Sequence, residues 1–241
     1  MGNIVTPFRI VVALAALSAA ALLGGSGLGY RLGWWEYRKG FEMLSWALYA
    51  GLGAAVLAIV ALAVPRVRTG RAVALALALV VGLGVAYVPW QWRERAQSVP
   101  RIHDISTDLQ DPPKFVAVLA LRKGAPNTAE YGGKEVADAQ RKGYPDIRPA
   151  QLDVPPQIAF ARALDTAERM GWSVVASNPA EGRIEATDTT FWYGFKDDVV
   201  VRITPAEGGS RVDVRSVSRV GRSDIGTNAQ RIRRYLAKLT S

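Results

Sequence analysis

The chain has 241 residues, of which 49% are hydrophobic, and a formal net charge of +9 at pH 7. It contains no cysteine and one histidine, which excludes disulfides, thiolate nucleophiles, cysteine-ligated metal centres and histidine-rich metal sites. Residues 1–95 carry +6 of the net charge and residues 96–241 carry +3. Because a nucleic-acid-binding protein would concentrate its excess charge in the soluble part, we expect no nucleic-acid partner.

The N-terminal part contains three long apolar segments, at residues 8–30, 45–64 and 72–90. Each approaches the roughly 20 residues that a helix needs to cross a bilayer core. Residues 1–95 are therefore predicted to form three transmembrane helices, with the lipid bilayer as a partner, and the third helix is expected to end at Pro89. A cleaved signal peptide is an alternative for the first segment, but the two apolar segments that follow favour its retention.

The composition of these segments bears on their role. Small residues recur every four positions at Ala50, Ala54 and Ala58, which predicts close packing between helices. No segment holds an acidic residue, a lysine or a histidine at mid-depth, which argues against a pump or a proton-coupled transporter. The three helices are thus expected to act as a tether or a docking surface.

The numbers of lysines and arginines at the two ends of the helices are close and do not decide the orientation, so the prediction depends on how the arginines are grouped and where the tryptophans lie. The loop between the second and third segments is short and purely basic, whereas the first loop and the exit from the third segment carry the tryptophans. These residues are Arg66, Arg68 and Arg71 in the basic loop, and Trp34, Trp35, Trp90 and Trp92 at the opposite end. We predict a bacterial inner-membrane protein whose N-terminus is cytoplasmic and whose C-terminal domain is periplasmic.

Residues 96–154 are rich in proline, which resists both helix and sheet. They are predicted to form an extended strap with one short strand at residues 115–121 and one short helix at residues 129–141.

Regular periodicity returns in residues 155–241. A helix is expected from the double proline at 155–156 to about residue 171, and a second helix over residues 224–239. Between them lie four predicted strands joined by short turns, which favours antiparallel neighbours. The strands are expected at residues 172–176, 183–191, 197–204 and 211–218. This order predicts a two-layer α+β domain consisting of a helix, a four-strand meander and a helix.

Three stretches of the soluble part are distinctive: IHDISTDLQDPPKF at residues 102–115, FWYGFKDD at residues 191–198 and SVSRVGRSDIGTN at residues 216–228. On these stretches, residues 100–240 resemble the uncharacterised family named domain of unknown function 1499. The resemblance implies the boundaries of the domain and brings no assigned activity.

The segment that joins the last strand to the last helix is the first candidate ligand-binding site. A helix start flanked by arginines can hold a phosphate or a carboxylate, and a glycine permits an unusual backbone angle there. The alternative is a capped turn whose arginines are solvated, with a serine or aspartate accepting hydrogen bonds from free amides. The candidate residues are Arg219, Gly221, Arg222, Ser223, Asp224 and Asn228.

The aromatic segment around Trp192 and Tyr193 is the second candidate. It is expected to form an apolar lip over a ligand groove or to dip into the membrane interface, unless its rings simply fill the core. The adjacent Asp197 and Asp198 lie on one strand and must face opposite sides, so they cannot converge on a substrate. Each is expected to pair with a nearby arginine such as Arg202.

No cofactor or metal site is predicted. The acidic residues near His103 match no metal-binding loop, and an extended strap tied down by hydrogen bonds explains them better. Phosphate-loop, dinucleotide and nucleophile-elbow motifs are absent from the sequence, so the catalytic residues, if any, are unknown.

These observations favour a non-enzymatic binding module of the cell envelope. Its predicted partner is an anionic or amphipathic small ligand, or another membrane protein. Two rival predictions are a hydrolase or lyase that uses aspartate and arginine, and an assembly factor whose helices bind a membrane complex.

Overall fold

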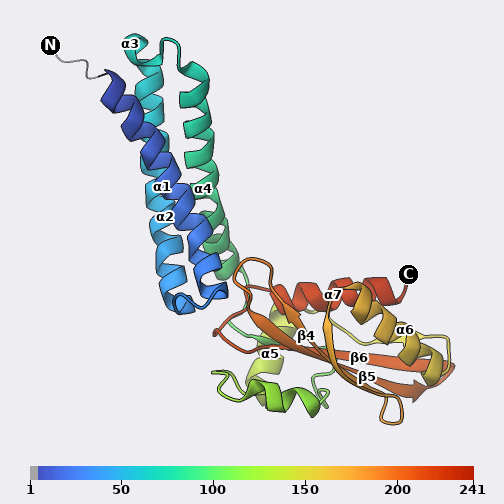
Figure 1. The fold of residues 1–241 in the computed structure, drawn as a ribbon. Coiled ribbons are helices and arrows are strands. Elements are labelled where there is room, and N and C mark those ends of the chain that lie inside the picture. The colour runs from blue at the N-terminus through green and yellow to red at the C-terminus, as the bar shows by residue number, and fades with distance from the viewer. Residues whose placement is uncertain (1–4) are drawn as a thin grey trace. The chain divides into compact units, whose positions relative to one another are not determined.

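A computed structural model describes residues 5–241. The chain divides into two compact units (Figure 1). The first unit runs to Arg95 and includes the short segment Trp192–Gly194. The second unit comprises Ala96–Phe191 and Phe195–Ser241, so the proline-rich strap belongs to the same unit as the C-terminal residues.

The first unit confirms the three predicted long helices: α1 (Val5–Arg31), α2 (Tyr37–Ala63) and α4 (Ala72–Ser98). All three are long and apolar enough to cross a membrane, which indicates membrane association. A single turn of helix, α3 (Pro65–Arg68), joins α2 to α4. The expectation that the third helix ends at Pro89 is wrong, because α4 continues for nine residues beyond it. A proline removes only one donor, and a long helix tolerates that loss.

Small residues bring α2 and α4 into close contact. A Cβ atom on Gly51 would lie 2.7 Å from the carbonyl oxygen of Gly82, and one on Gly82 would lie 2.8 Å from the amide nitrogen of Ala55. Ala54 and Ala58 are buried in the same bundle. The predicted row of small residues is therefore a packing surface between helices.

The second unit is built on a six-stranded antiparallel sheet. Its meander follows the predicted order, with β3 (Ser173–Asn178), β4 (Arg183–Thr189), β5 (Lys196–Ala206) and β6 (Gly209–Ser218) hydrogen-bonded in sequence. The strap adds β1 (Asp104–Ser106) and β2 (Ala150–Leu152), which both pair with β6. Neither short strand was predicted, because three residues carry too little periodicity.

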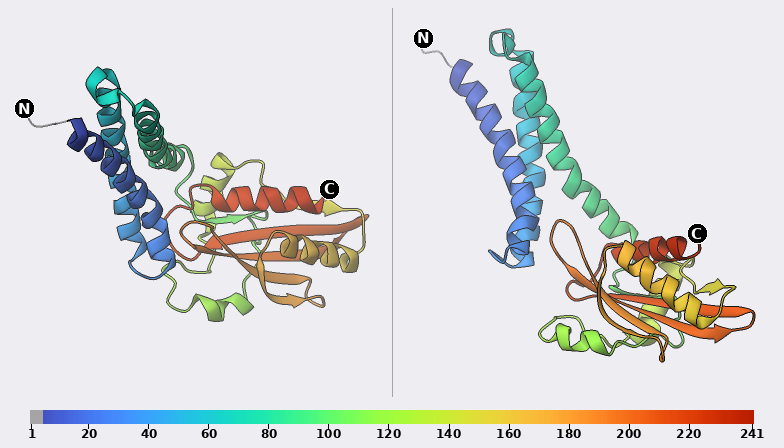
Figure 2. Two further views of the ribbon diagram at one scale, coloured as in Figure 1. Left: turned by 45° about the horizontal axis from the view of Figure 1, so that its top comes forward. Right: turned by 45° about the vertical axis from the view of Figure 1, so that its right-hand side comes forward.

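Two helices, α6 (Pro156–Arg169) and α7 (Thr227–Leu239), cover the same face of the sheet (Figure 2), which confirms the two-layer α+β fold. Pro156 occupies the first turn of α6, where a proline costs no hydrogen bond. Trp172 and Tyr235 stack with ring centroids 4.9 Å apart inside the core between this face and the helices. We call this face of the sheet the helix face and the opposite one the strap face.

The strap holds two short helices. The strand predicted at residues 115–121 is wrong: residues Ala117–Arg122 form the 3-10 helix η1. The reason lies in Glu185 of β4, whose buried carboxylate accepts the backbone N–H groups of Val116, Ala117 and Val118, each at 3.0 Å. Three successive amides can converge on one carboxylate in a helical turn, but alternate in direction along a strand. The predicted short helix is α5 (Gly133–Gly143), shifted a few residues along the chain.

Candidate functional site

The strap face of the sheet is lined with charged side chains, most of them buried. Along β5, Val199, Val201 and Ile203 point to the helix face, while Asp198, Val200 and Arg202 point to the strap face. This alternation confirms that Asp197 and Asp198 face opposite sides. Ion pairs of Asp198, Arg202 and Arg215 connect this face to the strap, in addition to the backbone pairing of β1 and β2 with β6.

Asp198 is the centre of one buried cluster. Its carboxylate accepts hydrogen bonds from Arg122 of η1 at 2.6 Å, from Arg219 at 2.8 and 2.9 Å, and from the Thr187 hydroxyl at 2.7 Å. Burial by itself would raise the pKa of this carboxyl, but the hydrogen bonds from Arg219, Thr187 and Arg122 outweigh burial and lower the pKa. Asp198 is thus a structural anion that joins the strap to two strands.

Asp197 has a different partner on the helix face. Arg231 of α7 is buried and donates to Asp197 at 2.5 Å and to Asp188 at 2.7 Å. The expectation that Arg202 would pair with these two aspartates is wrong, because Arg202 binds acidic residues of the strap and β6 instead. Arg202 lies four and five residues further along β5, whereas Arg122 of the strap and Arg231 of α7 contact Asp198 and Asp197 directly.

Arg215 forms a second buried pair on the strap face. It contacts Asp104 with two hydrogen bonds of 2.7 and 2.9 Å, and its guanidinium lies between the rings of Phe115 and Tyr131 at 5.2 and 5.3 Å. Burial, followed by the charge of Asp104, raises the pKa of Tyr131 to about 12. His103 ties the strap down through its carbonyl oxygen, which accepts from Ser218 and Asn228.

The strand–helix turn brings its predicted residues together around internal hydrogen bonds. Asp224 accepts from the backbone N–H groups of Gly226 at 2.9 Å and Asn228 at 2.7 Å, as a cap would. Burial raises the pKa of Asp224, against the effect of these two amides. The Asn228 side chain is buried and bonded to the hydroxyls of Ser216 and Ser218.

The remaining turn residues differ in availability. Gly221 adopts a positive φ of 95°, which confirms the unusual backbone angle, and Ser223 accepts from the amide of Ile225. Arg219 is held by Asp198, whereas Arg222 is exposed. An anion at this turn would therefore depend on Arg222 among the predicted arginines.

Trp192 and Tyr193 belong to the first unit. Tyr193 is 1% exposed, and its hydroxyl lies 3.2 Å from that of Ser26. The Trp192 ring lies so close to α1 that a Cβ on Gly27 would approach its Cδ1 to 2.5 Å. Gly27 of α1 thus gives room for the Trp192 ring, and Gly40 of α2 gives room for the Tyr193 ring. The two aromatic residues belong to the first unit, whereas the strand–helix turn belongs to the second.

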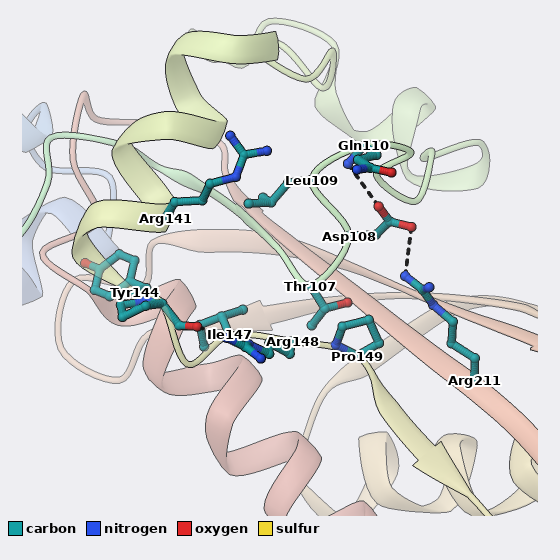
Figure 3. A pocket seen from close by; sticks show the side chains of 11 residues that line it. Thr107, Asp108, Leu109, Gln110, Arg141, Tyr144, Ile147, Arg148, Pro149 and Arg211 are labelled. Carbon is teal, nitrogen blue, oxygen red and sulfur yellow. Dashed lines mark hydrogen bonds and ion pairs between the residues drawn. The ribbon is translucent and has the colours of Figure 1, made fainter.

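A cleft of about 550 Å³ opens in the second unit, and none of the residues of the two predicted sites lines it. Its walls come from the strap loop that follows β1, from the end of α5 with the segment after it, and from β6 (Figure 3). Three arginines and an apolar surface share this lining. The lining residues are Thr107, Asp108, Leu109, Gln110, Arg141, Tyr144, Pro145, Ile147, Arg148, Pro149 and Arg211.

The three arginines of the cleft differ in their partners. Arg211 donates to Asp108 at 2.9 Å and to Asp213 at 3.0 Å, and Arg141 pairs with Asp138 at the surface. Arg148 is exposed and forms no ion pair among residues 5–241; its Nε donates to the Pro145 carbonyl at 3.4 Å. The cleft therefore offers an uncompensated guanidinium beside apolar walls.

Asp108 is the one acidic residue in the lining. Burial would raise the pKa of its carboxyl, but the backbone amides of Asp111 and Gln110 and the charges of Arg211 and Arg202 lower the pKa. Asp108 is consequently ionised at neutral pH, and its carboxylate already accepts hydrogen bonds from two arginines and two backbone amides. It is therefore poorly suited to act as a base.

The sequence model of a protein family of unknown function, DUF1499, matches residues 104–239. The chain belongs to the DUF1499 family. No curated protein and no solved structure matches it. The matched residues include the strap from Asp104 onward, both sheet faces and the whole cleft, and exclude the three long helices.

Sequence reasoning missed the cleft of this DUF1499 domain because its residues come from three places in the chain. The available signal was weak: Arg141, Arg148 and the aromatic Tyr144 follow one another within eight residues, next to prolines. Among residues 5–241, no group of three or more histidines and acidic residues could hold a metal ion.

Proposed function

We propose that this protein is a membrane-anchored, non-enzymatic binding module of the cell envelope, and that its DUF1499 domain binds an anionic, amphipathic small molecule. The observation that carries the proposal is the cleft, in which Arg148 has no carboxylate partner among the described residues. A guanidinium recognises carboxylate and phosphate groups with paired hydrogen bonds, and the walls formed by Tyr144, Ile147 and Pro149 suit an apolar chain.

The charges elsewhere in the domain support binding rather than chemistry. Asp198, Asp197 and Asp104 are each paired with arginines inside the protein. Carboxylates held in this way by buried guanidinium groups are unavailable for proton transfer to a substrate. A hydrolase or lyase would need an acidic group outside these pairs, and Asp224, the acid named for that rival, is turned inward onto backbone amides.

The test compares three ligands on the purified full chain by native mass spectrometry. Dodecyl phosphate and dodecanoate carry the anionic group, and dodecanol is the uncharged control. We expect both anions to bind more tightly than dodecanol, and Arg148→Ala to weaken the anions by about tenfold, the loss of one charge-assisted hydrogen bond. Arg222→Ala at the strand–helix turn is the matched control and should leave binding unchanged.

The same variants separate two positions for the ligand. If Arg222→Ala weakens binding and Arg148→Ala does not, the ligand occupies the turn. If neither anion binds better than dodecanol, the domain does not bind anionic amphiphiles and a protein partner becomes the better explanation. Crosslinking in native membranes, followed by purification, addresses that partner.

We also propose that the N-terminus is cytoplasmic and the DUF1499 domain periplasmic, in a bacterial inner membrane. Arg9 supports this because its guanidinium donates to the carbonyl oxygens of Val67 and Thr69 at 2.7 and 2.8 Å. It therefore adds its charge to the basic loop at the end of the bundle predicted to be cytoplasmic. Reporter fusions after Arg95 test the orientation, and strong activity of a cytoplasmic reporter there would contradict it.

A further inference from the structure

Phe191 is the most exposed large apolar side chain of the described residues, at 93%. It lies in the tight connection between β4 and β5, which is closed by two hydrogen bonds: Thr190 N–H to the Phe195 carbonyl, and Phe195 N–H to the Thr190 hydroxyl, both 2.8 Å. Gly194 completes the turn with a φ of 71°. The exposed ring is thus presented by a well-defined turn, and an isolated soluble domain would gain nothing from it.

The residues that follow Phe191 are part of the first unit. Trp192 packs with Trp92 at a centroid distance of 5.3 Å, and Tyr193 packs with Phe41 at 5.4 Å. Phe191 precedes Trp192 directly in the chain. The residue with the exposed ring is therefore bonded directly to a residue that packs against the helices at their tryptophan-bearing end.

That end of the helices has the composition of a membrane–water interface. Trp34 and Trp90 are 67% and 50% exposed, and Leu32 in the α1–α2 turn is also exposed. Exposed tryptophans at the end of an apolar helix mark the headgroup level of a bilayer. Phe191 is joined in the chain to Trp192, which packs on Trp92 at this end of the helices.

We propose that Phe191 is an interfacial membrane anchor: its ring enters the lipid layer at the level of Trp34 and Trp90. The surface it fits is the boundary between headgroups and acyl chains, which accepts single aromatic rings. The anchor is distinct from the ligand-binding cleft and does not depend on it. The turn between β4 and β5 would then be a fourth point of attachment to the membrane, after the three helices.

The test uses single cysteines, which the cysteine-free chain makes unambiguous. Phe191→Cys, Trp34→Cys and Glu207→Cys are labelled with bimane, and the full chain is reconstituted in phosphatidylcholine–phosphatidylglycerol vesicles. Glu207 is the matched control, since it is exposed in the β5–β6 turn. We expect the labels at 191 and 34 to emit at a shorter wavelength than the label at 207. Lipids that carry a nitroxide near the headgroup should quench most of the fluorescence of these two labels. The label at 207 should keep its emission.

A label at 191 that behaves like the label at 207 would overturn the proposal. So would a shift to shorter wavelength without quenching by lipid nitroxides, because protein would then cover the site. The unsubstituted chain provides an independent readout: a photoactivatable lipid should crosslink to the peptide that contains Phe191. Absence of that crosslink, with crosslinks to the three helices present, would also overturn it.

Discussion

Replacement of Asp198 by asparagine tests the role of the charged strap face most directly. Asp198 is fully buried and holds Arg122 and Arg219, whose side chains are 4% and 14% exposed. Asparagine keeps the shape but removes the charge, which leaves two guanidinium groups facing each other in the interior. Loss of one partner from a buried ion pair costs about 3–5 kcal/mol.

Arg122 retains other acceptors, among them the carbonyl oxygens of Asn127 and Thr128. The lower end of that range, about 3 kcal/mol, is therefore the expected loss for Asp198→Asn. For a domain of this size, it corresponds to a fall in Tm of about 10 °C. Thermal unfolding of the solubilised full chain gives the value, and hydrogen exchange across β5 and β6 locates the loss.

Asp165→Asn is the matched control, since Asp165 pairs with Arg169 on the exposed side of α6. Its loss should be below about 1 kcal/mol, as for other surface pairs. If Asp198→Asn is no more destabilising than Asp165→Asn, the ion pairs on the strap face do not hold the strap, and the reasoning fails.

The pH dependence of the same comparison has a definite sign. The pKa of Asp198 is lowered in the folded protein, so its contribution to stability is present above the unfolded value near 4 and is lost as the pH falls through the folded pKa. The difference between wild type and Asp198→Asn should therefore shrink below about pH 4. Asp104 and Asp224, whose pKa values are raised, have the opposite sign but are present in both proteins and cancel.

Three further substitutions test the packing. Gly51→Leu should disrupt the contact with Gly82 and lower the thermal stability of the helices. Gly53→Leu is the control and should not, because a Cβ at Gly53 meets nothing within 4 Å. The purified yield and the melting temperature in detergent compare the two variants. Tyr235→Phe should lose about 1 kcal/mol of stability, because the buried hydroxyl donates to a carbonyl at 2.8 Å, and an unchanged Tm would contradict this. Glu185→Gln should speed hydrogen exchange at the start of η1, and protection equal to wild type would show that the carboxylate does not hold those amides.

Periodicity predicted the parts of the fold that a single segment determines. The three long helices and the β3–β6 meander each bury a continuous apolar face, so the pattern appears in consecutive residues. The strap could not be read in this way. Its strands have three residues each, and η1 depends on Glu185, which is 67 residues or more away in sequence.

The candidate site was harder to predict, because the sequence does not show which arginines the fold pairs with carboxylates. At the strand–helix turn, Arg219 looked available for a ligand, but the fold uses it to neutralise Asp198. In the cleft, Arg148 looked like any other residue of a proline-rich strap, yet the structure gives it no carboxylate among the described residues. Local sequence reveals that a guanidinium is present, whereas only the three-dimensional arrangement reveals whether a buried carboxylate has already engaged it. The proposed function rests on Arg148 because it lines the cleft and forms no ion pair among the described residues.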